Sequence, residues 1–124
     1  MTKTTTLPIS AEKLSDFIIE GLVEKKGLEI VRLDLRGIPQ AVCDFFVVCS
    51  GTSSTHVNGL SDSVDEIVKK KTGEDPWHVE GYKQAEWVLM DYINVVVHIF
   101  QPEARTFYSI EKLWADAPAK RISI

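Results

Sequence analysis

The sequence has few of the features that mark metalloproteins, secreted disulfide scaffolds or membrane proteins. It contains two cysteines, Cys43 and Cys49, whose spacing fits neither a metal site nor a disulfide framework. Its longest uninterrupted apolar run covers residues 45–49, which is far too short to span a bilayer. The N-terminus has no apolar segment typical of a signal peptide. We therefore expect a cytoplasmic protein whose buried thiols are reduced.

Positive charge is also scarce. The chain has 14 lysine and arginine residues against 18 aspartate and glutamate residues, which gives a net charge of -4. The basic residues are scattered except for the run at 69–71. Such a surface does not attract a phosphate backbone, so direct sequence-specific nucleic-acid binding is not expected. An acidic surface remains compatible with a basic protein partner.

Residue patterns that would support catalysis are missing. A nucleotidyltransferase would join a Gly-Ser turn, such as the one at Gly51–Ser54, to paired carboxylates that hold metal ions, but no suitable pair follows it. The three histidines show no spacing typical of a zinc site. We predict no metal, no cofactor and no enzymatic activity. Because the turn precedes a helix N-terminus that could hold an anion, a nucleotidyltransferase-like nucleotide-binding enzyme is kept as an alternative.

The order of apolar patterns predicts a single α/β (α+β) domain at residues 10–115, between a flexible arm at 1–9 and a loose tail at 116–124. The expected elements are a helix from Ser10 to about Gly27, a strand at 29–35, a buried strand at 44–49, a helix ending at Gly73, a short strand at 77–80, a hairpin at 86–100 and a helix from Pro102. This order predicts a mixed sheet with helices packed mainly on one face. If all three helices lie there, the opposite face is open.

The segment 86–100 predicts a hairpin with two unequal faces. If Tyr92 and Ile93 form a two-residue turn, Trp87 faces His98. One hairpin face is then aliphatic and suits a core. The other face is too apolar to be simply solvated and too polar to be buried alone, so we expect a partner to cover it. Its residues are Trp87, Leu89, Asp91, Asn94, Val96, His98 and Phe100.

Several segments, in order, resemble the ribosomal silencing factor family, known as RsfS or Iojap-like proteins. They are LDLR at 33–36, DFFVVCSGTSS at 44–54, VEG at 79–81, AEWVLMDY at 85–92, VVVHIF at 95–100 and RTFYSIEKLW at 105–114. The resemblance implies a nucleotidyltransferase-like fold that lacks the catalytic carboxylates. One departure lies at the hairpin turn, where the family usually has Gly-Asp and this chain has Ile93-Asn94.

The resemblance also implies a function. Family members bind large-subunit ribosomal protein fourteen, sterically block association of the large and small ribosomal subunits, and so repress translation under nutrient limitation. They also tend to form homodimers when free. The resemblance implies partner-binding roles for Trp87, Asp91, His98, Arg105, Tyr108, Leu113 and Trp114. We also expect the hairpin residues Leu89 and Tyr92 to bind the partner.

Among these residues, Trp87 is expected to be an anchor whose change to alanine weakens partner binding by about 2 kcal/mol or more without disturbing the fold. A second alternative function is a dimeric interaction module with another target, in which the same aromatic face serves self-association.

Overall fold

The computed structural model describes residues 9–123. The arm predicted at residues 1–9 therefore lies outside the described residues except for its last position. The elements, in chain order, are α1 (Ala11–Glu24), β1 (Leu28–Asp34), β2 (Phe45–Ser50), α2 (Ser54–Thr72), β3 (His78–Glu80), β4 (Trp87–Asp91), β5 (Val95–Phe100), α3 (Pro102–Tyr108), α4 (Ile110–Leu113) and β6 (Ala119–Arg121).

The strands form one mixed six-stranded sheet in the order β3-β4-β5-β2-β1-β6. The central pair, β2 and β5, is parallel, and every other neighbouring pair is antiparallel. All residues of both central strands are buried. Parallel strands of this kind need cover on both faces, and their nearly continuous apolar sequences reflect that need. The predicted α+β fold with a mixed sheet is thus confirmed.

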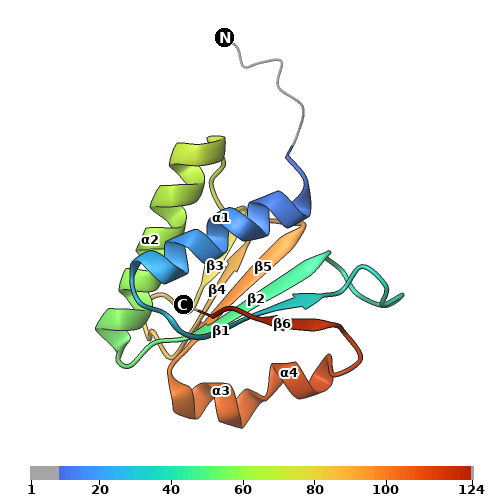
Figure 1. The fold of residues 1–124 in the computed structure, drawn as a ribbon. Coiled ribbons are helices and arrows are strands. Elements are labelled where there is room, and N and C mark those ends of the chain that lie inside the picture. Colours follow the sequence, from blue (N-terminus) through green and yellow to red (C-terminus); the bar gives the residue numbers. More distant parts are fainter. Residues whose placement is uncertain (1–8, 124) are drawn as a thin grey trace.

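The two long helices lie on the same face of the sheet (Figure 1), as the sequence predicted. α1 begins where the Ser10 side chain accepts a hydrogen bond from the Lys13 amide at 3.0 Å. α2 begins at the corresponding cap, Ser53, and ends at Gly73, whose φ of 79° suits glycine. Their apolar stripes and the inner face of the sheet form the larger core.

α1 and α2 approach each other closely at Gly21. A Cβ atom on this residue would lie 2.9 Å from the Cα of Val64, and the hydroxyl of Ser63 donates to the Gly21 carbonyl at 2.8 Å. Only glycine permits this separation of the two backbones. The close packing of α1 against α2 therefore depends on Gly21.

The opposite face of the sheet is partly covered, which the sequence did not predict. A single C-terminal helix was expected, but Ser109 adopts a left-handed conformation (φ 47°, ψ 45°) and divides it into α3 and α4. These short helices lie across the sheet from α1 and α2 (Figure 1) and contribute Ile110 and Trp114 to a second core. The outer side chains of the central strands, such as Phe46, require this cover because they are also apolar.

The C-terminal segment at 116–124 was expected to be loose, but residues 119–121 form β6 on the outer edge of β1. The Asp34 amide donates to the Pro118 carbonyl, and the Ile122 amide donates to the Ile30 carbonyl, both at 2.9 Å. The backbone groups of β1 would otherwise lack partners along this edge, which is the physical reason for the pairing. The sheet therefore extends past the domain boundary predicted at residue 115.

The hairpin has the predicted faces but a different register. Trp87 pairs with Phe100 and Leu89 with His98, so the pairing is shifted by two residues. The turn lies one residue later because Tyr92 is buried against the α1 and α2 core instead of serving as a turn residue. A shift of two leaves every side chain on its expected face.

A matched pair of substitutions tests the contact between α1 and α2. Gly21→Ala should lower the free energy of unfolding by about 2 kcal/mol, because the added methyl group forces the helices apart. Gly59→Ala changes a glycine within α2 that has no atom within 4 Å of the new methyl position, and it should raise stability by about 0.5–1 kcal/mol. Urea denaturation measures both effects, and equal effects of the two changes would contradict the packing argument.

Candidate functional site

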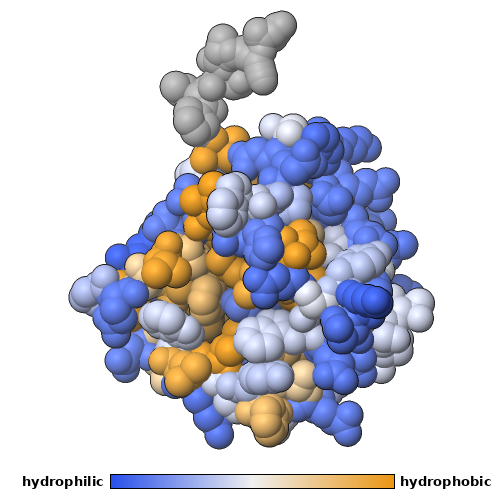
Figure 2. All heavy atoms as spheres, turned by 180° about the vertical axis from the view of Figure 1, so that it is seen from behind, coloured by the Kyte–Doolittle hydropathy of each residue, from blue (hydrophilic) through white to orange (hydrophobic). Residues whose placement is uncertain are grey.

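An uncovered strip of side chains follows β4 and α3 on the face of the sheet opposite α1 and α2. Seen from behind, Figure 2 shows hydrophobic residues gathered among polar ones on this side of the molecule. Trp77 and Phe107 at its two ends are 74% and 79% exposed, which is unusual for large apolar side chains. We call this strip the β4–α3 face and define it by Val42, Trp77, Trp87, Leu89, Asp91, Ile93, Phe107 and Tyr108.

Trp87 is fixed at the centre of the β4–α3 face by aromatic contacts. Its ring stacks on Phe100 with centroids 4.9 Å apart and contacts Tyr108 at 4.6 Å. Its Nε1 donates a hydrogen bond to Nδ1 of His98 at 3.1 Å. Trp87 is consequently half-buried, and truncating it removes internal packing as well as surface. These contacts oppose the expectation that Trp87→Ala leaves the fold undisturbed.

His98 was expected to contact a partner, but it is only 4% exposed and lies beneath Trp87. The ring of Phe46 packs against it with centroids 4.5 Å apart. Because Nδ1 accepts the Trp87 hydrogen bond, the imidazole proton is assigned to Nε2, which has no partner within residues 9–123. Burial lowers the pKa of His98 from 6.5 to about 4. His98 is therefore a neutral support for the Trp87 ring.

Tyr92 and Arg105 also serve the fold. Tyr92 lies on the α1 and α2 side of the sheet, where burial raises the pKa of its hydroxyl. Arg105 donates two hydrogen bonds to the carboxylate of Glu111, at 2.8 and 3.1 Å. It donates two more, to the Glu29 carbonyl at 2.9 Å and the Ser50 hydroxyl at 2.8 Å. Arg105 thus fastens α3 to α4, β1 and β2. Its guanidinium holds the pKa of Glu111 below its usual range.

The remaining predicted site residues are accessible to different degrees. Leu89 and Asp91 are half-buried on β4, and Tyr108 on α3 is exposed. Leu113 on α4 is exposed as well, whereas Trp114 is half-buried with its ring 5.7 Å from that of Phe46. The structure therefore brings Trp87, Leu89, Asp91 and Tyr108 together on one face. Leu113 lies at the end of α4, and Trp114 follows it directly.

Sequence reasoning missed four exposed apolar side chains of the β4–α3 face. Phe107 lies in the segment predicted as a single helix from Pro102, and with the break at Ser109 its side chain is exposed. Val42, Trp77 and Ile93 lie in loops or a turn, where apolar periodicity gives no signal. The only available sign for Trp77 was a large aromatic residue placed directly after a loop proline.

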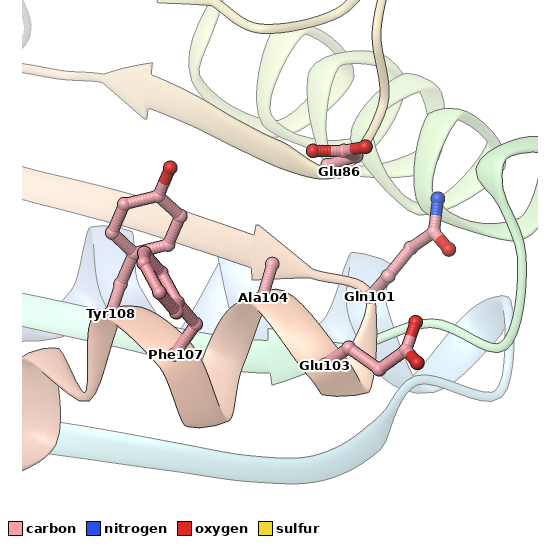
Figure 3. A pocket seen from close by; sticks show the side chains of 6 residues that line it. All are labelled: Glu86, Gln101, Glu103, Ala104, Phe107 and Tyr108. Carbon is pink, nitrogen blue, oxygen red and sulfur yellow. The ribbon is translucent and has the colours of Figure 1, made fainter.

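One hollow of about 400 Å³ lies at the α3 end of the β4–α3 face. It is lined by Glu86, Gln101, Glu103, Ala104, Phe107 and Tyr108. Figure 3 shows the two aromatic rings at one end, Gln101 and Glu103 at the other, and Glu86 across from α3. No lysine or arginine lines it. The side-chain amide of Gln101 donates to the Ala85 carbonyl at 3.0 Å, so the loop before β4 holds this side chain in place.

The turn at Gly51–Ser54 is closed by the chain's own side chains. The Thr52 amide donates to Nδ1 of His56 at 2.9 Å, and the His56 amide donates to the Ser53 hydroxyl at 3.1 Å. A Cβ atom on Gly51 would lie 3.0 Å from a methyl carbon of Val57, so the turn also packs tightly on α2. These contacts fit a helix cap and use two of the amide donors that a phosphate would need.

Two further observations concern residues 9–123 as a whole. They hold no cluster of three or more His, Cys, Asp or Glu side chains arranged to bind a metal ion. None of the helices in this range has the length and apolar character required to cross a membrane.

The fold and the site together define an α+β domain with an exposed aromatic and apolar surface. The family model described as "Ribosomal silencing factor during starvation" matches residues 8–124, and the chain belongs to this family, RsfS. A ribosomal silencing factor RsfS from Halalkalibacterium halodurans is 36% identical over 110 residues, covering 89% of this chain and 92% of the relative.

Two other similarities extend this result. A crystal structure from Chromobacterium violaceum superimposes with a TM-score of 0.81 at 34% identity, covering 86% of this chain and 88% of that one. A mouse protein named mitochondrial assembly of ribosomal large subunit protein 1 is 36% identical over 73 residues, covering 57% of this chain and 32% of the mouse protein.

The lowered pKa of His98 predicts acid sensitivity. As the pH falls below about 6.5, the unfolded state gains a proton on this residue, whereas the folded state stays neutral until about pH 4. Stability should therefore be lost as the pH falls through this window, by about 2 kcal/mol between pH 7 and pH 5. Urea denaturation at the two pH values measures the loss. His98→Gln should show a smaller difference, and an equal difference would contradict the assignment to His98.

Proposed function

We propose that this protein is a ribosomal silencing factor that binds large-subunit ribosomal protein fourteen through the β4–α3 face. Membership of the RsfS family supports action on the ribosome. The name of the mouse relative, which refers to assembly of the large subunit, supports that subunit as the partner. The single observation that carries the proposal is the exposure of Trp77 and Phe107 at the two ends of one apolar strip.

The chemistry of the β4–α3 face suits a basic protein. Large aromatic side chains provide anchors with much contact area, and they are enriched in the energetic centres of protein interfaces. Carboxylates lie beside them, with Asp91 on β4 and Glu86 and Glu103 around the α3 hollow. Proteins that pack against ribosomal RNA carry many lysines and arginines, so opposite charges would orient the complex and speed its formation.

The proposed mechanism is steric occlusion without a chemical step. A domain of 13.9 kDa bound to the surface of the large subunit would occupy the space that the small subunit needs, and translation would fall under nutrient limitation. The proposal treats the protein as a non-enzyme in the cytoplasm, and as a homodimer when it is free. A nucleotidyltransferase-like origin of the fold stays a prediction.

Binding to purified large ribosomal subunits tests the proposal with a matched pair of aromatic substitutions. Trp77→Ser removes a side chain that is 74% exposed on the β4–α3 face and should weaken binding about tenfold or more. Tyr82→Ser removes an exposed aromatic ring whose hydroxyl donates to Asp62 on α2, on the other side of the sheet, and should leave binding unchanged. Co-sedimentation on sucrose gradients measures both.

The same gradients report subunit joining. Wild-type protein should co-migrate with large subunits and reduce the amount of joined ribosomes, whereas Trp77→Ser should restore joining. If the wild-type protein migrates apart from large subunits, the proposed function is wrong. If both aromatic variants bind like the wild type, the protein binds ribosomes through another surface.

A further inference from the structure

A second hollow, of about 470 Å³, lies at the tip of the β4–β5 hairpin. We call it the tip hollow, and it is lined by Val42, Cys43, Trp77, Asp91, Ile93 and Val96. Val42, Trp77 and Ile93 are exposed and form its walls, whereas Cys43 and Val96 are buried and form its floor. The tip hollow is thus an apolar depression with one carboxylate at its edge.

Ile93, which forms one wall of the tip hollow, has an unfavourable backbone conformation. Its φ is 75°, and the Asn94 amide donates to the Tyr92 carbonyl at 2.9 Å, which together describe the rarer, strained form of the γ-turn. A β-branched side chain in this region of backbone conformations is strongly disfavoured. The Asp91 carboxylate accepts a hydrogen bond from the Ile93 amide at 2.7 Å and holds the turn.

Burial in the protein does not explain why Ile93 occupies this turn. Its side chain is 59% exposed, so little apolar area is removed from water in the free protein. Strained residues of this kind are typical of functional sites. The exposed side chain projects beside the tip hollow, where a bound partner would cover it.

Charge around the tip hollow indicates the character of that partner. None of the six lining residues is basic, and Asp91 stands at the edge. Burial raises the pKa of the Cys43 thiol to about 11, and the negative charges of Asp91 and Asp44 add to this effect. Two carboxylates therefore lie close to the floor, which favours a lysine or arginine on the partner beside the apolar contact.

We propose that the tip hollow receives an aliphatic side chain of the protein partner, next to a lysine or arginine that pairs with Asp91. Ile93 is the specificity-determining wall of this subsite. Burial of Tyr92 sets the strained turn, and isoleucine is kept at its centre for the contact with the partner. The inference rests on the proposed function, because the partner is the protein bound by the β4–α3 face.

Variants of Ile93 separate stability from binding. Ile93→Gly and Ile93→Asn both relieve the unfavourable backbone conformation, so each should raise the melting temperature by about 2–4 °C. Both remove the apolar wall, so each should weaken binding to purified large ribosomal subunits about five- to tenfold. Ile93→Val retains a branched apolar side chain and should bind like the wild type.

Lys26→Gly is the matched control, because Lys26 is exposed, has a φ of 59° and lies at the end of α1, away from the hairpin. It should raise the melting temperature without changing affinity. If Ile93→Gly and Ile93→Asn bind as tightly as the wild type, this inference is overturned while the proposed function stands. If both have lower melting temperatures, the argument from strain is overturned. If the wild-type protein does not bind large subunits, the proposed function and this inference both fail.

Discussion

The burial of both faces of β2 and β5 is the constraint on which the rest of the structure depends. These parallel strands have no exposed residue, so each face of the sheet must be covered at its centre. α1 and α2 cover one face of both central strands, but α3 and α4 are short and cover only part of the other face. Arg105 fastens them there through four hydrogen bonds. β4 is left at the edge of this cover, which is why its outer side chains are available to a partner.

The hairpin tip shows two opposing energies. Placing Tyr92 directly after β4 buries its aromatic ring against α1 and α2, which stabilises the fold, although its hydroxyl has no hydrogen-bond partner among the described residues. The same register puts Ile93 at a positive φ, which costs about 1–2 kcal/mol. The register that buries the Tyr92 ring therefore carries backbone strain at Ile93. The backbone strain at Ile93 is then a consequence of core packing. The Ile93 side chain itself is exposed and lies outside the core.

Local patterns predicted much of the fold but less of the site. Ser10 and Gly73 have the predicted roles because helix caps depend on residues close in the sequence. The faces of the hairpin were predictable because alternation survives a shift of two residues. Its register was not, since it depends on burying Tyr92 against distant helices. Likewise, the left-handed conformation of Ser109 that ends α3 beside the exposed Phe107 leaves no periodic signal.

The two unusual turns of this fold differ in where their polar and apolar groups find partners. At Gly51–Ser54, two amides are bonded within the turn through His56 and Ser53, and Gly51 packs against Val57. At Ile93, the backbone amide is bonded to Asp91, but the side chain remains in water. A turn whose polar and apolar groups are paired within the protein stabilises the fold. An exposed apolar side chain at a strained turn can instead gain stabilisation by contact with another molecule. The hairpin tip is accordingly the better place to seek a partner than the glycine turn.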